Sequence, residues 1–112
     1  MADEIEFAAR FARAIVGGDS RAAHEMLSDD FRNAVAAKDL SAQFALLAKE
    51  MGGVAGIGEP MVILEEWPDM SANDRAMVYV PFEGDVYSEA ITVTISAIDD
   101  TLYISSVEWG RP

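Results

Sequence analysis

Two side chains in this sequence are candidates for general acid–base chemistry, the carboxylate of Glu89 and the imidazole of His24. Glu89 has the same parity as Ile91 and Val93, so an unbroken strand would point it toward the buried side of a sheet. A carboxylate desolvated there is suited to proton transfer, whereas one at a protruding strand end would lie in water. Imidazoles titrate near neutral pH, so His24 is either a second candidate base or a residue at a helix boundary.

Aromatic side chains offer a second kind of site. Trp67, Tyr87 and Tyr103 could line a ligand cavity, because each combines an apolar ring with an indole N–H or a hydroxyl group. Tyr79 could do the same, but it also fits an outer sheet face that packs against another copy of the chain. For Tyr79 we favour the packing role.

No metal or cofactor site is predicted. The sequence has no cysteine and its carboxylates are scattered, while the pairs Glu65-Glu66 and Asp99-Asp100 straddle strand faces or sit in turns, so neither is a side-by-side dyad. Residues 53–58 are rich in glycine, but they leave a helix and enter a strand, the reverse of a dinucleotide fingerprint. We therefore interpret residues 53–58 as a flexible connection.

A strand at residues 87–98 is the centre of the predicted fold. Its residues alternate between apolar and small polar types, which is typical of a strand with one buried face. The buried face carries Ile91, Val93, Ile95 and Ala97, and the outer face carries Thr92, Thr94 and Ser96. Further strands are predicted at residues 61–67, 75–82 and 102–109, with hairpin turns at 83–85 and 99–100. A β-bulge at Ser105-Ser106 would put Ile104, Val107 and Trp109 on one side.

Helices are predicted before the sheet, where they would cover its buried face. Phe7, Phe11 and Ile15 form the apolar stripe of a helix at residues 3–16, which Gly17-Gly18 ends. A second helix follows from Asp19 or Ser20 to residue 27, and residues 28–35 add a further turn. A third long helix runs from residue 39 or 41 to 51. The sequence thus predicts one α+β domain over residues 1–112, with three N-terminal helices covering a four-stranded antiparallel sheet.

Composition restricts the partners. The chain has 20 acidic and 8 basic residues and a net charge of -12, which disfavours nucleic acid and anionic membrane surfaces. The N-terminus lacks the pattern of a signal peptide, and no apolar run is long enough to span a membrane. A cytoplasmic protein is the simplest expectation, although a leader removed beforehand would not be visible.

Three stretches of the sequence carry a resemblance to a known superfamily. They are Phe11-Ala-Arg-Ala-Ile-Val-Gly-Gly-Asp19, then Ala23 with Met26-Leu27-Ser-Asp-Asp-Phe31, and Ile98-Asp-Asp-Thr-Leu-Tyr-Ile104-Ser-Ser-Val107-Glu-Trp109. They resemble the first two helices and the final hairpin of the nuclear transport factor 2-like superfamily, also called cystatin-like. The resemblance implies a cone-shaped domain with a curved sheet, of a small uncharacterised branch.

The same resemblance implies several functions. The superfamily includes ketosteroid isomerases, dehydratases, epoxide hydrolases and polyketide cyclases, as well as non-catalytic binding and dimerisation domains. Its enzymes place an Asp or His base, often with Tyr partners, in a cavity between sheet and helices. This chain instead has Phe7 and Phe11 on the inward stripe of its first helix.

Three hypotheses for the function follow. The leading one is a non-catalytic dimeric domain, without cofactor, that binds a small neutral or weakly basic hydrophobic ligand between sheet and helices. The second is an isomerase, dehydratase or hydrolase of a small hydrophobic substrate, with Glu89 or His24 as base. The third is an acidic interaction module for a basic protein. A deep pocket with two polar groups would favour the enzyme. A shallow pocket beside a contiguous acidic face would favour the interaction module.

A homodimer is expected through the outer sheet face. Thr92, Thr94 and Ser96 lie beside Met77 and Tyr79 in a region with little charge, whereas the rest of the chain is strongly acidic. Like charges elsewhere would repel two copies, so this neutral face is where they can meet.

Overall fold

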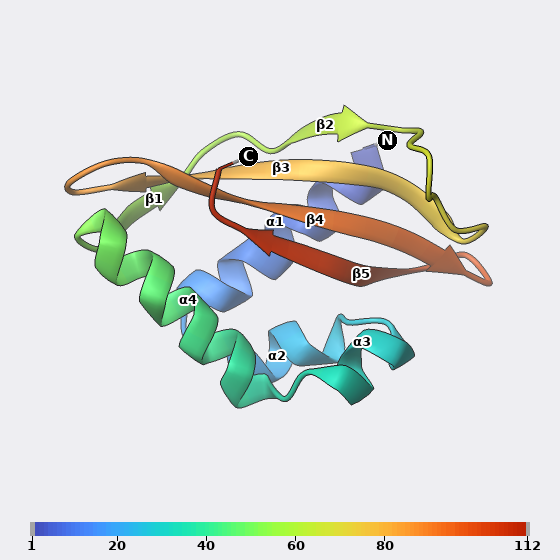
Figure 1. The fold of residues 1–112 in the computed structure, drawn as a ribbon, viewed down its shortest axis with the longest axis horizontal. Helices are drawn as coiled ribbons and strands as arrows, with labels where there is room; N and C mark the ends of the chain where they lie inside the picture. Colours follow the sequence, from blue (N-terminus) through green and yellow to red (C-terminus); the bar gives the residue numbers. More distant parts are fainter. Residues whose placement is uncertain (1, 112) are drawn as a thin grey trace.

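The structure is a computed structural model that describes residues 2–111, and for residue 2 only its place in the backbone. The helices come first and the strands follow, as Figure 1 shows. The helices are α1 (Ala2–Val16), α2 (Ser20–Glu25), α3 (Asp29–Ala34) and α4 (Ala37–Met51). The strands are β1 (Val54–Ile57), β2 (Met61–Leu64), β3 (Asp74–Gly84), β4 (Glu89–Ile98) and β5 (Thr101–Trp109). The predicted α+β class is therefore confirmed.

All strand pairs are antiparallel, and β3 and β4 form the middle of the sheet. One edge of β3 pairs with both β1 and β2, while its other edge pairs with β4, which in turn pairs with β5. Val93 lies between Val78 and Val107 on one face, and Thr92 lies beside Tyr79 on the other. The two faces predicted from the alternation in β4 are confirmed.

The predicted β-bulge in β5 is also confirmed. Thr94 pairs with Ser106 and the next residue, Ile95, pairs with Ile104, which leaves Ser105 as the extra residue. The hydroxyl of Ser105 donates to the Thr94 carbonyl oxygen at 3.3 Å. Because of this extra residue, Ile104, Val107 and Trp109 all share the face of Ile95.

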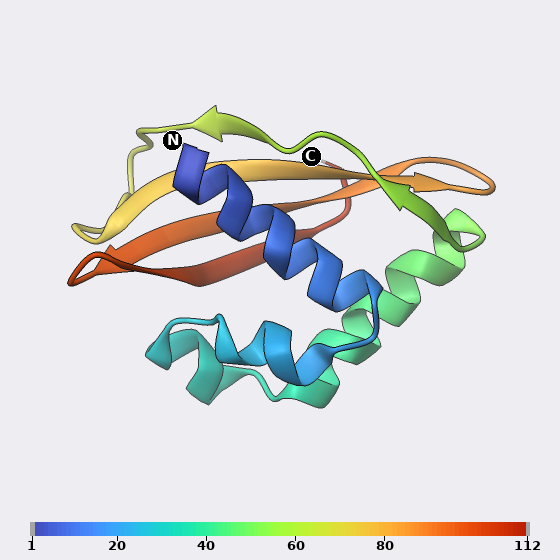
Figure 2. The same cartoon turned by 180° about the vertical axis from the view of Figure 1, so that it is seen from behind.

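Helix α1 covers the inner face of the sheet, as the view from behind in Figure 2 shows. Phe11 and Val93 are both 0% exposed and belong to one hydrophobic core, as expected for partners across the helix–sheet interface. The same core includes fully buried side chains from β3, β5, α4 and the segment after α2, namely Val78, Val80, Phe82, Ile104, Leu40, Met51 and Leu27. These side chains fill the space between sheet and helices.

Local signals set the ends of the helices largely as predicted. Asp19 caps α2 by accepting a hydrogen bond from the Ala22 N–H at 3.1 Å. Gly18, which follows α1, has a φ of 81°, a conformation that favours glycine. The Asp39 carboxylate accepts from the Ala36 N–H at 3.0 Å, so α4 begins earlier than residue 39.

Two counts differ from the prediction. Residues 29–34 form a helix of their own, so the described chain has four helices rather than three. Part of the glycine-rich stretch forms β1, so the sheet has five strands rather than four. The prediction of a flexible connection at residues 53–58 is therefore wrong for the residues of β1. Gly56 pairs with Glu83, and the Gly58 N–H donates to the Pro81 carbonyl at 2.8 Å. Strand β2 is shorter than predicted, because its pairing with β3 stops at Leu64.

The outer face of the sheet carries no helix in the described part of the chain, and in Figure 1 this face is turned toward the viewer. Thr92, Thr94 and Ser96 are nonetheless only 5%, 7% and 4% exposed. They are small side chains in a central strand, and larger neighbours such as Tyr79 and Met77 on β3 limit their contact with solvent. None of the helices within residues 2–111 has the length and apolar character needed to cross a membrane.

Replacement of Phe11 by Ala tests the packing of α1 on the sheet. It removes a fully buried ring from the centre of the core and is expected to lower the free energy of unfolding by about 3–5 kcal/mol. The measurement is a denaturant melt of both proteins. A loss below about 1 kcal/mol would contradict the helix-over-sheet core.

Candidate functional site

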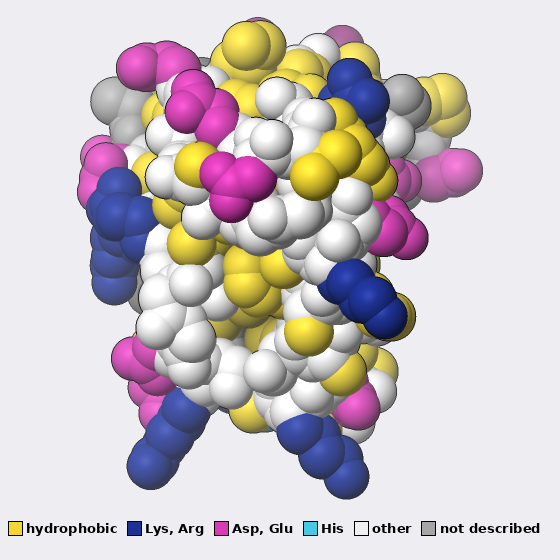
Figure 3. Space-filling view, turned by 90° about the vertical axis from the view of Figure 1, so that its left-hand side faces the viewer, with side chains coloured by type: hydrophobic (Ala, Val, Ile, Leu, Met, Phe, Trp, Pro, Cys, Tyr) yellow, Lys and Arg dark blue, Asp and Glu magenta, His cyan; other side chains and the backbone are white. Residues whose placement is uncertain are grey.

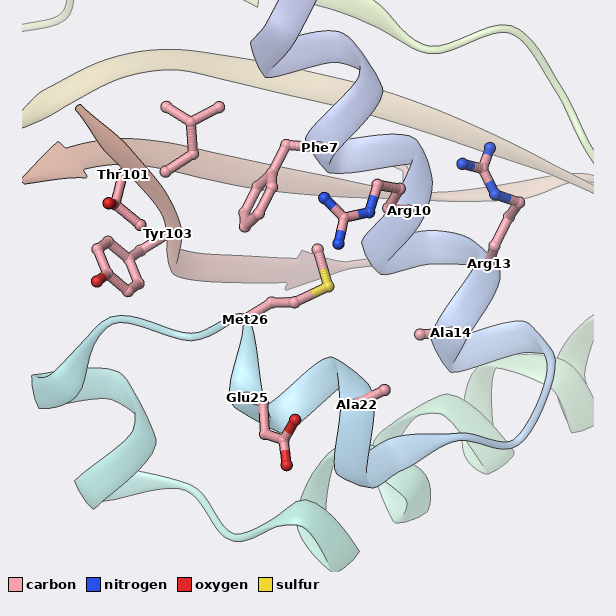
Figure 4. A pocket seen from close by; sticks show the side chains of 10 residues that line it. Phe7, Arg10, Arg13, Ala14, Ala22, Glu25, Met26, Thr101 and Tyr103 are labelled. Carbon is pink, nitrogen blue, oxygen red and sulfur yellow. The ribbon is translucent and has the colours of Figure 1, made fainter.

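A groove of about 520 Å³ lies between α1, α2 and the beginning of β5 (Figure 4). Its apolar lining comes from Phe7 and Ala14 of α1, Ala22 of α2, Met26 after α2, and Leu102 of β5. Alanines on the facing sides of the two helices leave room that larger side chains would fill. Phe7 is the first member of the apolar stripe and is only half-buried, so one side of its ring faces the groove.

The polar groups of the groove differ in how they are engaged. The Arg13 guanidinium forms an ion pair with Glu6 at 2.8 Å, and Glu25 lies 3.7 Å from Arg21 with its side chain 66% exposed. Arg10 instead lies over Phe7, with Cζ 5.8 Å from the ring centroid. In Figure 4 the Arg10 guanidinium extends toward Phe7 and Met26, whereas the Glu25 carboxylate points away from them. The groove can bind an apolar group beside an arginine.

The three aromatic residues predicted to bind a ligand lie apart. Tyr103 lines the groove together with Thr101. Trp67 lies in the connection between β2 and β3, and Tyr87, which is 41% exposed, lies in the connection between β3 and β4. Figure 1 shows these two connections at opposite ends of the sheet. The structure therefore gathers only Tyr103 with the residues of the groove.

His24 does not line the groove. Its half-buried ring lies beside the end of α3, with Nε2 2.6 Å from the carbonyl oxygen of Val35. A carbonyl only accepts hydrogen bonds, so Nε2 carries the hydrogen in this contact. The contact ties α2 to the chain after α3.

Glu89 lies on the inner face at the start of β4, opposite Phe82, as its parity predicts. Its side chain is 14% exposed, and Oε1 accepts a hydrogen bond from the Arg111 N–H at 2.7 Å. The neighbouring Gly110 N–H donates to the Ala90 carbonyl at 2.8 Å. Glu89 thus fastens the segment after β5 to the beginning of β4, away from the groove.

Arg10 was not predicted as a residue of the site, and Phe7 was predicted only as part of the apolar stripe of its helix. A signal was present, because Phe7 is the stripe residue nearest the N-terminus of α1 and arginines follow it three and six positions later. On a helix, positions three apart lie on neighbouring parts of one face. The sequence did not reveal that this part of α1 extends past the buried centre of the sheet.

Carboxylates gather around the N-terminal end of α1. Glu4, Glu65, Glu66 and Asp74 surround Arg75 in a hollow of about 590 Å³. Asp3 and Asp100 border adjoining hollows, one of which shares Phe7 and Arg10 with the groove. The acidic surface therefore continues up to one end of the groove.

The opposite end of the molecule exposes apolar side chains instead. Figure 3 shows hydrophobic side chains recessed in this face, with charged side chains around them. In the connection between β3 and β4, Val86 is 73% exposed. A smaller hollow of about 220 Å³ is formed by α4 residues, including Leu46 and Leu47, with Trp109 of β5.

Within residues 2–111, no group of three or more His, Asp or Glu side chains is placed to hold a metal ion. No protein-family model, curated protein or solved structure matches this chain. Its function is therefore inferred from the groove and the surfaces described above.

The hydrogen bond of Glu89 predicts a difference between two variants. Glu89→Ala should lower the free energy of unfolding by about 1–2 kcal/mol, because the Arg111 N–H loses a charged acceptor. Glu89→Gln keeps an amide oxygen that can accept the same bond, so it should retain most of the stability. Thermal melts of both variants measure this, and equal losses in the two would contradict the proposed contact.

Proposed function

We propose that this chain is a small binding domain that forms a homodimer and holds a small hydrophobic ligand in the groove between α1, α2 and β5. The observation that carries the proposal is the apolar lining of the groove, where Phe7, Met26 and Leu102 meet at the boundary of helices and sheet. Its volume of about 520 Å³ lies within the range of small-molecule sites.

Binding is favoured over catalysis because of where the candidate bases lie. Glu89 accepts a hydrogen bond from the backbone of Arg111, and His24 contacts the backbone of Val35. Both groups hold chain segments together outside the groove. The carboxylate that does line the groove, Glu25, is largely exposed and pairs with Arg21.

The homodimer is proposed through the outer face of the sheet. Besides Thr92, Thr94 and Ser96, this face carries Met77 and Tyr79 of β3. Met61 and Leu64 of β2 pair with Tyr79 and Met77 and are 51% and 42% exposed. Contact between two such faces would remove these apolar side chains from water. The groove lies on the helical side of the sheet and would stay open in such a dimer.

Membership of the nuclear transport factor 2-like superfamily, with its cone shape, belongs to the same proposal. It is supported by the order of helices before sheet, by α1 lying across the inner face, and by the capped turn at Asp19. A cytoplasmic location, as expected from the sequence, is also part of the proposal.

A second candidate function is favoured by the carboxylates around the N-terminus of α1. Asp3, Glu4, Glu65, Glu66, Asp74 and Asp100 border adjoining hollows, with Arg75 among them. Such a surface would attract a basic protein at long range. In this alternative the acidic end is the functional surface, and the groove is a consequence of the small side chains between α1 and α2.

Replacement of Ala22 by Phe tests the groove. The larger ring should occupy the space beside Ala14 and Met26, and so reduce binding of the neutral probe N-phenyl-1-naphthylamine by about fivefold or more. Probe fluorescence measures the binding. Ala42→Phe, at an exposed position of α4, is the matched control and should bind like the wild type. If both variants bind the probe equally well, it is not held in this groove.

Replacement of Thr94 by Lys tests the dimer. A charged side chain in the middle of the outer face should convert dimer to monomer at micromolar concentration, because an unpaired ammonium buried in the interface is costly. The fold of each copy should stay intact. Light scattering measures the mass, and circular dichroism checks the fold. Ala45→Lys, exposed on α4, adds the same charge elsewhere and should leave the dimer in place. A wild-type chain that stays monomeric at higher concentration would contradict the proposal.

A further inference from the structure

We propose that the ligand of the groove carries an anionic head group, such as a carboxylate, which the Arg10 guanidinium binds. Its apolar part lies on Phe7, Met26 and Leu102. This inference rests on the proposed function, because it names the chemical class of ligand for the same groove. It also differs from the neutral or weakly basic ligand that the net charge of -12 suggests.

The position of Arg10 is the first observation. Its Cζ lies 5.8 Å from the centroid of the Phe7 ring, so the cation is held over an apolar side chain that lines the groove. Figure 4 shows the guanidinium extending from α1 toward Met26. A guanidinium presents several N–H donors in one plane and suits a carboxylate head, which can accept two of them at once.

The pairing of the neighbouring charges is the second observation. Glu6 is four positions before Arg10 and could pair with it along the helix. It pairs instead with Arg13, at 2.8 Å. Within residues 2–111 no carboxylate forms an ion pair with Arg10, so its donors are open to a ligand. Arg13 thereby contributes indirectly, because it pairs with the carboxylate one turn before Arg10 on α1.

The surrounding carboxylates set the orientation of the ligand. Asp3 and Asp100 border the hollow beyond Phe7 and would repel an anion there. Glu25 points away from Phe7 and Met26 in Figure 4 and pairs with Arg21. The head group is therefore expected on the Arg13 side of Arg10, with the tail covering Phe7 and Leu102 toward β5.

Three probes with ten-carbon chains and different heads test the proposal: decanoate and decyltrimethylammonium below their critical micelle concentrations, and decan-1-ol below its solubility limit. Amide NMR spectra of the full chain locate binding and give the affinities. Decanoate should bind in the groove about tenfold more tightly than decanol, the effect of one partly exposed charged hydrogen bond, and the cation should bind most weakly.

Variants assign the preference to Arg10. Arg10→Gln keeps a polar side chain without the charge and should reduce decanoate binding to the level of decanol. Lys49→Gln makes the same change of charge at an exposed position of α4 and should retain the tenfold preference.

The experiment distinguishes failure of the anionic head group from failure of the proposed binding function. If all three probes shift groove residues with equal affinity, the groove binds apolar ligands and the anionic head is wrong. The same conclusion follows if Arg10→Gln leaves the preference for decanoate unchanged. If none of the probes shifts groove residues, the proposed binding function is wrong as well.

Discussion

Packing of α1 against the inner face of β3 and β4 is the interaction on which the rest of the structure depends. Phe11 enters a surface formed by alternate residues of the two central strands, including Val78 and Val93. Residues from α4 and β5 fill the remaining space, so the middle of the molecule is closed core. A ligand can therefore be held where the helices extend past this core, or on the sheet face that they leave uncovered.

The groove and the outer sheet face follow from this division. At the N-terminal half of α1 the stripe residue Phe7 is only half-buried, and alanines on α1 and α2 leave a hollow beside it. On the other side, Thr92 and Thr94 of β4 lie between Tyr79 and Met77 of β3 and Glu108 and Ser106 of β5. Carboxylates gather around the N-terminal end of α1, at one end of the groove.

Local patterns in the sequence were sufficient for most of the fold. Alternation in β4 predicted both of its faces, and the shift of apolar phase in β5 predicted the bulge at Ser105. Asp19 and the glycines after α1 predicted helix ends, because caps depend on neighbouring residues. These features are decided within a few positions of the chain.

What the sequence did not reveal depends on partners far apart in the chain. Strand β1 lies within the glycine-rich stretch and forms by pairing with β3, where Glu83 lies opposite Gly56 and Phe82 opposite Ile57. The role of Glu89 was missed because its partner, the Arg111 N–H, is 22 positions away. The groove was missed for the same reason, since it requires α1, α2 and β5 to meet around Phe7.

The proposed dimer joins two copies through the uncovered sheet face and leaves the helical side free. The chain has no cysteine, so a single one at Glu108, exposed on the outer face of β5 opposite Thr92, can carry a unique nitroxide label. Pulsed dipolar spectroscopy should then show a defined, short distance between the two labels, and a longer one for a label at Ala45 on α4. No coupling between labels at Glu108, or a shorter distance at Ala45 than at Glu108, would contradict this account.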